Sequence, residues 1–381
     1  MTTAPGASVN DRRVDGSFTL YRLFDVGYSI DLGRAAELLG SSTRGRARPV
    51  RLEARAIEIR NPPLVVALED CDLVVGGATH RASLSAHVFD FGVCSMQLRV
   101  PTRQSWPWSA FVDFAAALDA STDPPAIFDR ELSALLQRLD GAIERRDVAP
   151  LFEEYKVYRL DRVSVDGRKV DGAMANVFPD VEVVPLLVGE RRSVAPATLR
   201  ELVPFRFSYY DDDLTVLSWE TALIVEPRAE DRDVEYVLEF ANAQLLELRM
   251  YDQQLDAELP ALYDRVESVR ASTRLRLTGK FRQVLSDLQT RVADVTETVE
   301  RVENSLKVTN DVYLARVYAA ALELFREQAW RRGIERKLGI LRDTYAMLND
   351  EAQTLRMELL EIIVVLLIFA EIALAVMSGH R

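Results

Sequence analysis

The chain has 381 residues, of which 48% are hydrophobic and 28% are charged. This is enough apolar sequence for two folded domains, and it excludes global disorder. With 47 Lys and Arg against 59 Asp and Glu, the formal charge of −12 argues against a general nucleic-acid binder, because phosphate contacts need surplus basic residues.

Residues 1–16 are small and polar, so we expect a disordered tail. They contain no apolar segment typical of a secretory signal, and we therefore expect the bulk of the chain to stay in the cytoplasm. From 17 to 228, runs rich in β-branched and aromatic residues alternate with helical patterns, which predicts a cytosolic α+β domain. The expected strands lie within residues 18–30, 50–59, 83–100, 155–160 and 214–225.

Helical patterns occur between these runs, over residues 32–39, 109–118 and 128–143. A short sequence also repeats: residues 24–27 read Phe-Asp-Val-Gly and residues 89–92 read Phe-Asp-Phe-Gly. Each copy precedes a helix-like run, so the repeat is consistent with two βαβ-type units in a ferredoxin-like arrangement. Chance similarity explains it equally well.

From 229 to 356 the sequence is helical, and Pro260 is the last proline. Apolar residues alternate at spacings of three and four between charged flanks, which predicts long helices that form a coiled coil or a helical hairpin. The core of this seam comprises Leu285, Leu288, Val292, Val295, Val299, Val302 and Leu306. A second seam begins at Ile334 and continues through Leu338 and Leu341 without proline, which indicates one long helix reaching the C-terminal apolar segment. An amphipathic bundle helix with a separate span is the alternative.

The C-terminal segment 357–378 has the composition of a membrane span. Residues 359–377 contain two Glu and would form roughly 28 Å of helix, close to the ~30 Å thickness of the bilayer core. Because only a few residues follow it, we expect a single-pass tail anchor in a bacterial inner membrane. A helix buried in the hydrophobic core of a folded domain is the alternative.

Glu361 is expected at the cytosolic end of this span and Glu371 within it. Ala375 and Gly379 follow Glu371 along one helical face, and small residues on such a face allow close approach of a second helix. We therefore predict a membrane-embedded oligomer interface at Glu361, Glu371, Ala375 and Gly379. A tolerated carboxyl group that contacts headgroup water is the alternative for Glu371.

Residues 360–371 read Leu-Glu-Ile-Ile-Val-Val-Leu-Leu-Ile-Phe-Ala-Glu. This stretch resembles the terminal Leu-Glu-x-Ile-Ile-x-x-Leu-Ile-x-x-Glu pattern of the required-for-meiotic-nuclear-division family, which includes YagE-like bacterial proteins and is a family of unknown function. Residues 243–252, with Ala243-Gln244 and Tyr251-Asp252, resemble a second stretch of that family. The sequence departs from it at residues 310–313, at Asp252 and at Leu245, which suggests a divergent bacterial member. The resemblance implies membrane attachment and self-assembly, and it supplies no catalytic residue.

The sequence offers few residues for chemistry. It lacks P-loop, G-x-G-x-x-G, G-x-S-x-G and H-E-x-x-H patterns, and Cys71, Cys94, His80 and His87 lack the tight spacing of a metal site. We therefore expect no catalytic residue, cofactor or metal. One basic cluster includes Arg44, Arg46 and Arg48, which could bind an anion; a flexible loop with exposed arginines is the alternative.

These observations predict a non-enzymatic, membrane-tethered scaffold that self-assembles through its helical region and binds an unknown protein partner. The first alternative is a component of a membrane transport or signalling assembly that uses Glu371. The second is an enzyme with an unrecognised site in the α+β domain, which a deep pocket lined by converging polar groups would favour.

Overall fold

The computed structural model describes residues 12–46, 57–59, 61–102, 104–170, 173–271, 306–308 and 312–378, together with residues 286, 290 and 293. The chain divides into two compact units. Unit 1 comprises Met1–Met250 and Arg301–Gln328, and unit 2 comprises Tyr251–Glu300 and Ala329–Arg381.

Unit 1 is built on a mixed sheet, which has 12 strands among the described residues. Its main path runs β13-β14-β15-β11-β1-β8-β7-β5-β3, with β6, β9 and β12 paired at the side. Neighbours on this path are antiparallel except for β11 and β15, which are parallel. The strands of this sheet are β1 (Arg12–Asp25), β3 (Thr43–Arg46), β5 (Leu64–Ala67), β6 (Cys71–Val75), β7 (Ala78–Val88), β8 (Val93–Pro101), β9 (Trp106–Pro107), β11 (Phe152–Val165), β12 (Arg168–Lys169), β13 (Phe205–Phe207), β14 (Leu214–Leu217) and β15 (Thr221–Val225).

Two short strand pairs lie outside this sheet. β2 (Gly27–Ile30) pairs with β10 (Ile143–Arg146), and β4 (Ile57–Ile59) pairs with β16 (Leu306–Val308). The described part of the chain therefore does not form the predicted ferredoxin-like domain. The long strands β1 and β11 pair along most of their 14 residues, and further strands are added on both sides of that pair.

The two faces of the sheet differ in polarity because successive strand residues point to opposite sides. On β7 and β8 the even positions are apolar and buried, from Ala82 to Val88 and from Cys94 to Val100. The odd positions between them are polar, apart from Val93. On these two strands one face is therefore an apolar core surface, and the opposite face is polar.

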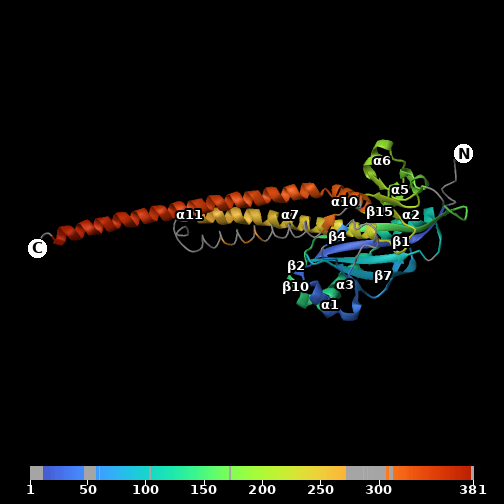
Figure 1. Cartoon of the computed structure of the whole chain (residues 1–381), viewed down its shortest axis with the longest axis horizontal. Coiled ribbons are helices and arrows are strands. Elements are labelled where there is room, and N and C mark those ends of the chain that lie inside the picture. Colours follow the sequence, from blue (N-terminus) through green and yellow to red (C-terminus); the bar gives the residue numbers. More distant parts are fainter. Residues whose placement is uncertain are drawn as a thin grey trace. The chain divides into compact units, whose positions relative to one another are not determined.

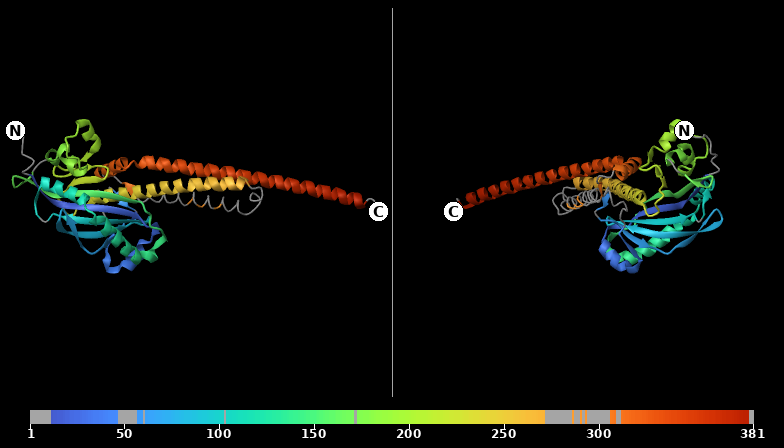
Figure 2. Two further views of the ribbon diagram at one scale, coloured as in Figure 1. Left: turned by 180° about the vertical axis from the view of Figure 1, so that it is seen from behind. Right: turned by 45° about the vertical axis from the view of Figure 1, so that its right-hand side comes forward.

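Helices cover the apolar face. α1 (Leu32–Leu39) begins at Asp31, whose carboxylate accepts hydrogen bonds from the Gly33 and Arg34 amides. Phe111 of α2 (Trp108–Asp119) stacks on Phe18 of β1 with ring centroids 4.2 Å apart. α1 packs on α3 (Asp123–Leu139), and the two lie on the same side of the strands in Figures 1 and 2. Three shorter helices follow: α4 (Met174–Val177), α5 (Asp180–Leu187) and α6 (Pro196–Leu202).

The two copies of the repeated sequence meet at the end of β1 and β8. Phe24 pairs with Cys94 and Asp25 with Val93, and the Val26 amide donates to the Gly92 carbonyl at 2.9 Å. Gly92 has a φ of +98°, and a β-carbon there would lie 1.8 Å from the carbonyl oxygen of Gly27. Gly92 in the second copy is therefore required both by its positive φ and by the close approach of its backbone to Gly27 in the first copy.

The polar face is covered by the first part of α7 (Asp233–Ala271) and by α10 (Val312–Leu324). The Thr215 hydroxyl on β14 lies 3.0 Å from the Tyr313 hydroxyl on α10, and Tyr155 on β11 meets the ring of Phe325 edge to face. This part of α7 buries carboxylates and amides as well as apolar side chains, such as Phe240 against Phe89 and Phe91. Unit 1 is thus a sheet between two helical layers of different chemistry.

Unit 2 contains the remainder of α7 and nearly all of α11 (Glu327–Ser378), which runs without interruption as predicted. Ile334, Leu338 and Leu341 of the second predicted seam are buried. The Lys337 ammonium joins the two helices through carboxylate oxygens of Asp252 at 2.7 Å and Asp256 at 2.6 Å. Six residues of the first seam, from Leu285 to Val302, lie outside the described residues, and Leu306 lies in β16.

The predicted C-terminal membrane anchor is wrong. In the part of the chain that the structure describes, no helix combines the length and hydropathy needed to cross a bilayer. Between Glu361 and Glu371 the unbroken apolar run 362–370 is nine residues long. This gives only ~13.5 Å of helix against a bilayer core of ~30 Å. The inner-membrane localisation that was predicted from this anchor is therefore wrong as well.

Candidate polar ligand site

The candidate site begins with polar residues that three neighbouring strands present on one face. Strand register aligns Tyr21 on β1 with Gln97 on β8, and Gln97 with Ser85 on β7. Two residues along, Arg99 on β8 lies opposite both Thr19 and Ser83. Because all of these positions have the same parity, the side chains gather on the face covered by α7.

α7 brings carboxylates to this polar face. Glu235 and Glu239 are four residues apart, so both project from one side of the helix, separated by one turn or ~6 Å along its axis. Each has only 3% of its surface exposed. Buried carboxylates need hydrogen-bonding partners, and the strands supply them.

Glu235 is surrounded by guanidinium groups. Arg99 Nη2 donates to its Oε2 at 2.8 Å and Arg232 Nη1 to the same atom at 3.2 Å, while Arg159 Nη1 donates to Oε1 at 3.3 Å. The Tyr21 hydroxyl also donates to Oε2, at 3.3 Å. We call Glu235, Arg99 and Arg232 the arginine end of the site. Two arginines against one carboxylate leave this end with a positive surplus.

Glu239 pairs with Gln97 and His87. Gln97 Nε2 donates to its Oε1 at 2.8 Å, and His87 Nδ1 lies 2.7 Å from its Oε2. Gln97 Nε2 also lies 2.9 Å from His87 Nδ1, so the donor in each contact to the ring depends on the tautomer of His87. Among the described residues, the other ring nitrogen, His87 Nε2, makes no hydrogen bond. We call Glu239, His87 and Gln97 the histidine end of the site.

A cavity of about 280 Å³ connects the two ends. Arg99, Arg232, Glu235, Glu239 and His87 all line it. Its rim carries the exposed side chains of Arg44 from β3 and Asp70 from the segment before β6. The other lining residues are Tyr21, Val65, Ser83, Leu84, Ser85, Gln97 and Tyr236. This volume is close to the lower end of the range for small-molecule sites.

Burial keeps the aromatic hydroxyls of the cavity protonated. Burial, followed by the charges of Glu235 and Glu239, raises the pKa of Tyr21 well above its usual value, so its hydroxyl remains a hydrogen-bond donor to Glu235. The pKa of Tyr236 is raised as well, first by burial and then by Glu239 and Asp233. Both phenols are therefore neutral at physiological pH.

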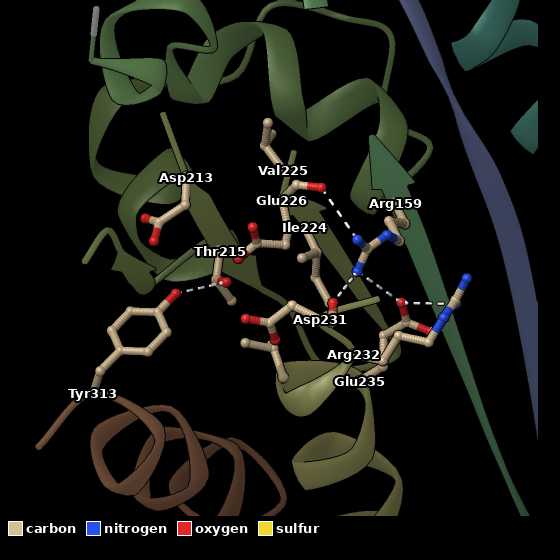
Figure 3. Close-up of a pocket in the computed structure, with 11 residues that line it drawn as sticks. Arg159, Asp213, Thr215, Ile224, Val225, Glu226, Asp231, Arg232, Glu235 and Tyr313 are labelled. Atoms are coloured by element: carbon tan, nitrogen blue, oxygen red, sulfur yellow. Dashed lines mark hydrogen bonds and ion pairs between the residues drawn. The ribbon is translucent and has the colours of Figure 1, made fainter. Parts of the chain in front are cut away.

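Arg159 anchors the segment that leads into α7 (Figure 3). Its guanidinium is 1% exposed, and it donates to the carbonyl oxygens of Asp231 at 2.6 Å, Arg228 at 2.7 Å and Glu226 at 3.1 Å. Burial acts to lower the pKa of Arg159, but Glu235 and Asp161 outweigh it and the pKa is raised. The cavity beside it in Figure 3 measures only about 10 Å³, room for about one water molecule, so this region positions α7 and does not hold a ligand.

The structure places the arginines of the predicted anion-binding cluster and the residues of the predicted oligomer interface in different parts of the chain. Of the basic cluster, Arg44 lines the cavity, Arg46 Nη1 donates to the Pro62 carbonyl at 3.0 Å, and Arg48 lies outside the described residues. Glu361 and Glu371 are exposed on α11. The side chain of Ala375 and all of Gly379 lie outside the described part. The membrane setting of the predicted interface is wrong together with the anchor, and its role in oligomerisation stays a prediction.

Sequence reasoning missed the residues that matter most at this site. Tyr21, His87, Gln97 and Arg99 sit within predicted strands at alternate positions, which is the pattern of a solvent-exposed sheet face. Polar residues of the same parity recurring in several strands are a signal for a shared polar face. The spacing of Glu235 and Glu239 at i and i+4 is the corresponding signal on the helix.

Comparison with known proteins gives the family. The family model described as "Uncharacterized protein MJ0711, N-terminal domain" matches residues 15–232, which is more than half of the chain. The chain therefore belongs to this family. "Uncharacterized protein MJ0711" from Methanocaldococcus jannaschii is 25% identical over 194 residues, covering 50% of this chain and 57% of that protein. The chain thus spans just over half the length of this relative, and no solved structure matches.

The inferred membership in the required-for-meiotic-nuclear-division and YagE-like family is wrong. The matched family lies over residues 15–232, whereas that resemblance rested on residues 243–252 and 360–371. Short patterns of Leu, Ile and Glu arise readily in unrelated amphipathic or apolar helices, so they carry little family information. The matched relative is archaeal, so a bacterial assignment has no support.

Proposed function

We propose that this member of the MJ0711 N-terminal-domain family binds a small molecule with an anionic group, which is held at the arginine end of the polar cavity. The observation that carries the proposal is the convergence of Arg99 and Arg232 on one buried carboxylate, Glu235, at the wall of a cavity of about 280 Å³. Guanidinium groups pair well with either a carboxylate or a phosphate, so the shared chemistry is a small organic anion.

Further contacts support an anion at this position. The side chains of Arg99 and Arg232 are 23% and 40% exposed, so both retain surface that a ligand can contact. Ser83 and Ser85 add hydroxyl donors on β7, and Arg44 lies at the rim together with Asp70. A buried structural ion pair would need none of these additional groups.

Isothermal titration calorimetry on the full chain tests this proposal with two probes, propyl phosphate and butyrate. At least one should bind, and Arg99→Gln should weaken binding by about tenfold or more because it removes a charged hydrogen-bond donor. Arg34→Gln is the matched control, since Arg34 is 54% exposed on α1 and pairs only with Glu37 among the described residues. Absence of binding by both probes, or equal affinities for Arg99→Gln and Arg34→Gln, would contradict the proposal.

A second property, self-association through α11, has its own support. Large apolar side chains are exposed between Leu360 and Ile372 around the helix, with Leu366 at 63% and Phe369 at 67%. A helix that is apolar on all sides needs to be enclosed, and the same segment of further copies matches it in length and chemistry. Sedimentation of the full chain should show an oligomer that Leu366→Glu with Phe369→Glu dissociates. A monomeric wild-type chain would rule this out.

A further inference from the structure

The two ends of the cavity carry opposite charge. Arg44 and Asp70 line the rim with one charge of each sign, and the charged residues of the interior are Arg99, Arg232, Glu235 and Glu239, with His87 beside Glu239. At the arginine end Glu235 faces both arginines, and Arg159 behind it is balanced by Asp161 at 2.7 Å. Every arginine lining the cavity interior is therefore at one end.

The histidine end contributes the Glu239 carboxylate to the cavity. Among the described residues, Glu239 has no lysine or arginine as a partner, and its two oxygens are bonded to Gln97 and His87. Only 3% of its surface is exposed. A buried carboxylate in this setting attracts a group that is positively charged and can donate a hydrogen bond, as an ammonium does.

We infer that the natural ligand is a zwitterion, with its anionic group at the arginine end and an ammonium group at the histidine end. This inference rests on the proposed function, because it places the anion where that function requires it. The positive and negative side chains of this cavity lie at opposite ends. A ligand whose anionic and cationic groups face the side chains of opposite charge therefore gains the most binding energy.

The spacing of the two ends limits the length of the ligand. Glu235 and Glu239 are one helical turn apart, ~6 Å along the α7 axis. The anion and the ammonium should therefore be joined by a short aliphatic chain, as in 3-aminopropyl phosphate or 4-aminobutyrate. The cavity volume of about 280 Å³ suits molecules of this size.

The test compares matched ligands on the wild-type chain by isothermal titration calorimetry. We expect 3-aminopropyl phosphate to bind at least about tenfold more tightly than propyl phosphate, or 4-aminobutyrate at least about tenfold more tightly than butyrate. The first pair tests a phosphate anion and the second a carboxylate. This comparison needs no variant, so it does not depend on whether a substituted chain folds.

Glu239→Gln then locates the ammonium, because it removes the charge while keeping a side chain of the same shape. It should abolish the advantage of the amino ligand and leave the affinity for the simple anion within about threefold. If the simple anions bind the wild type as tightly as the zwitterions, the inference is overturned while the proposed function stands. If no probe binds, the proposed function itself fails.

Discussion

Arg159 should be the side chain on which the polar layer of unit 1 depends most. It is 1% exposed and makes five hydrogen bonds: three to carbonyl oxygens of the segment before α7, one to Glu235 and one to Asp161. Removing one partner of a buried ion pair costs about 3–5 kcal/mol, and each carbonyl left without a donor adds ~1–3 kcal/mol. These terms overlap, so we expect Arg159→Met to destabilise unit 1 by at least about 4 kcal/mol.

Arg159→Lys separates charge from geometry. An ammonium keeps the positive charge near Glu235 but lacks the planar fork that reaches three carbonyls together, so the loss should be roughly half as large. Arg191→Gln is the control in unit 1, because the side chains of Arg191 and its partner Asp113 are 60% and 63% exposed, and its loss should cost less than about 1 kcal/mol.

Urea unfolding followed by tryptophan fluorescence measures these effects, since Trp106, Trp108 and Trp219 all lie in unit 1. An Arg159→Met chain that unfolds within about 1 kcal/mol of the wild type would contradict the prediction. A larger loss of stability for Arg191→Gln than for Arg159→Met would contradict it equally.

Three further predictions concern stability. Burial, opposed by the Gly27 amide and reinforced by Asp147, raises the pKa of Asp25 to about 7, so its contribution is fully present below about pH 4 and is lost as the pH rises through 7. In the wild type, ionisation of Asp25 should lower the free energy of unfolding by at most about 4 kcal/mol, and Asp25→Asn should abolish this pH dependence. Unfolding midpoints of the wild type that do not change between about pH 5 and pH 8 would disprove the prediction. Gly92→Ala should lower the thermal unfolding midpoint far more than Gly77→Ala. Both glycines have positive φ, but only at Gly92 would a β-carbon meet the Gly27 carbonyl oxygen. Equal decreases of the midpoint in the two variants would contradict the close approach. Lys337→Met leaves the Asp252 and Asp256 carboxylates without their shared cation and should destabilise unit 2 by ~1–3 kcal/mol, measured by circular dichroism, whereas a stabilised variant would refute the pairing.

Local patterns predicted many elements of the fold. The helix expected at 32–39 is α1 with the same bounds, and the helix expected at 109–118 is α2 with one more residue at each end. The α3 helix lies earlier than predicted, at Asp123–Leu139, because Pro124 and Pro125 can occupy its first turn. The unbroken helix into the C-terminal segment was also predicted. These features depend on residues close together in sequence, which is why periodicity detects them.

The same local reasoning failed where a pattern has more than one structural meaning. Apolar residues near 362–370 read as a membrane span, although the run between the two glutamates is too short for one. Short similarities near the C-terminus indicated a family that the match over residues 15–232 does not support. Hydropathy and short motifs report composition, and composition alone does not decide what surrounds a segment.

The candidate site was decided by tertiary structure alone. Alternation in β7 and β8 establishes from sequence that Ser85, His87, Gln97 and Arg99 share one face, but that pattern is equally typical of a sheet face in water. Only the fold places α7 over this face, so that Glu235 meets Arg99 across 136 residues of sequence and Glu239 meets His87 across 152. Which side chain neutralises a buried charge depends on such long-range contacts, and the periodicity of a single strand or helix carries no information about them.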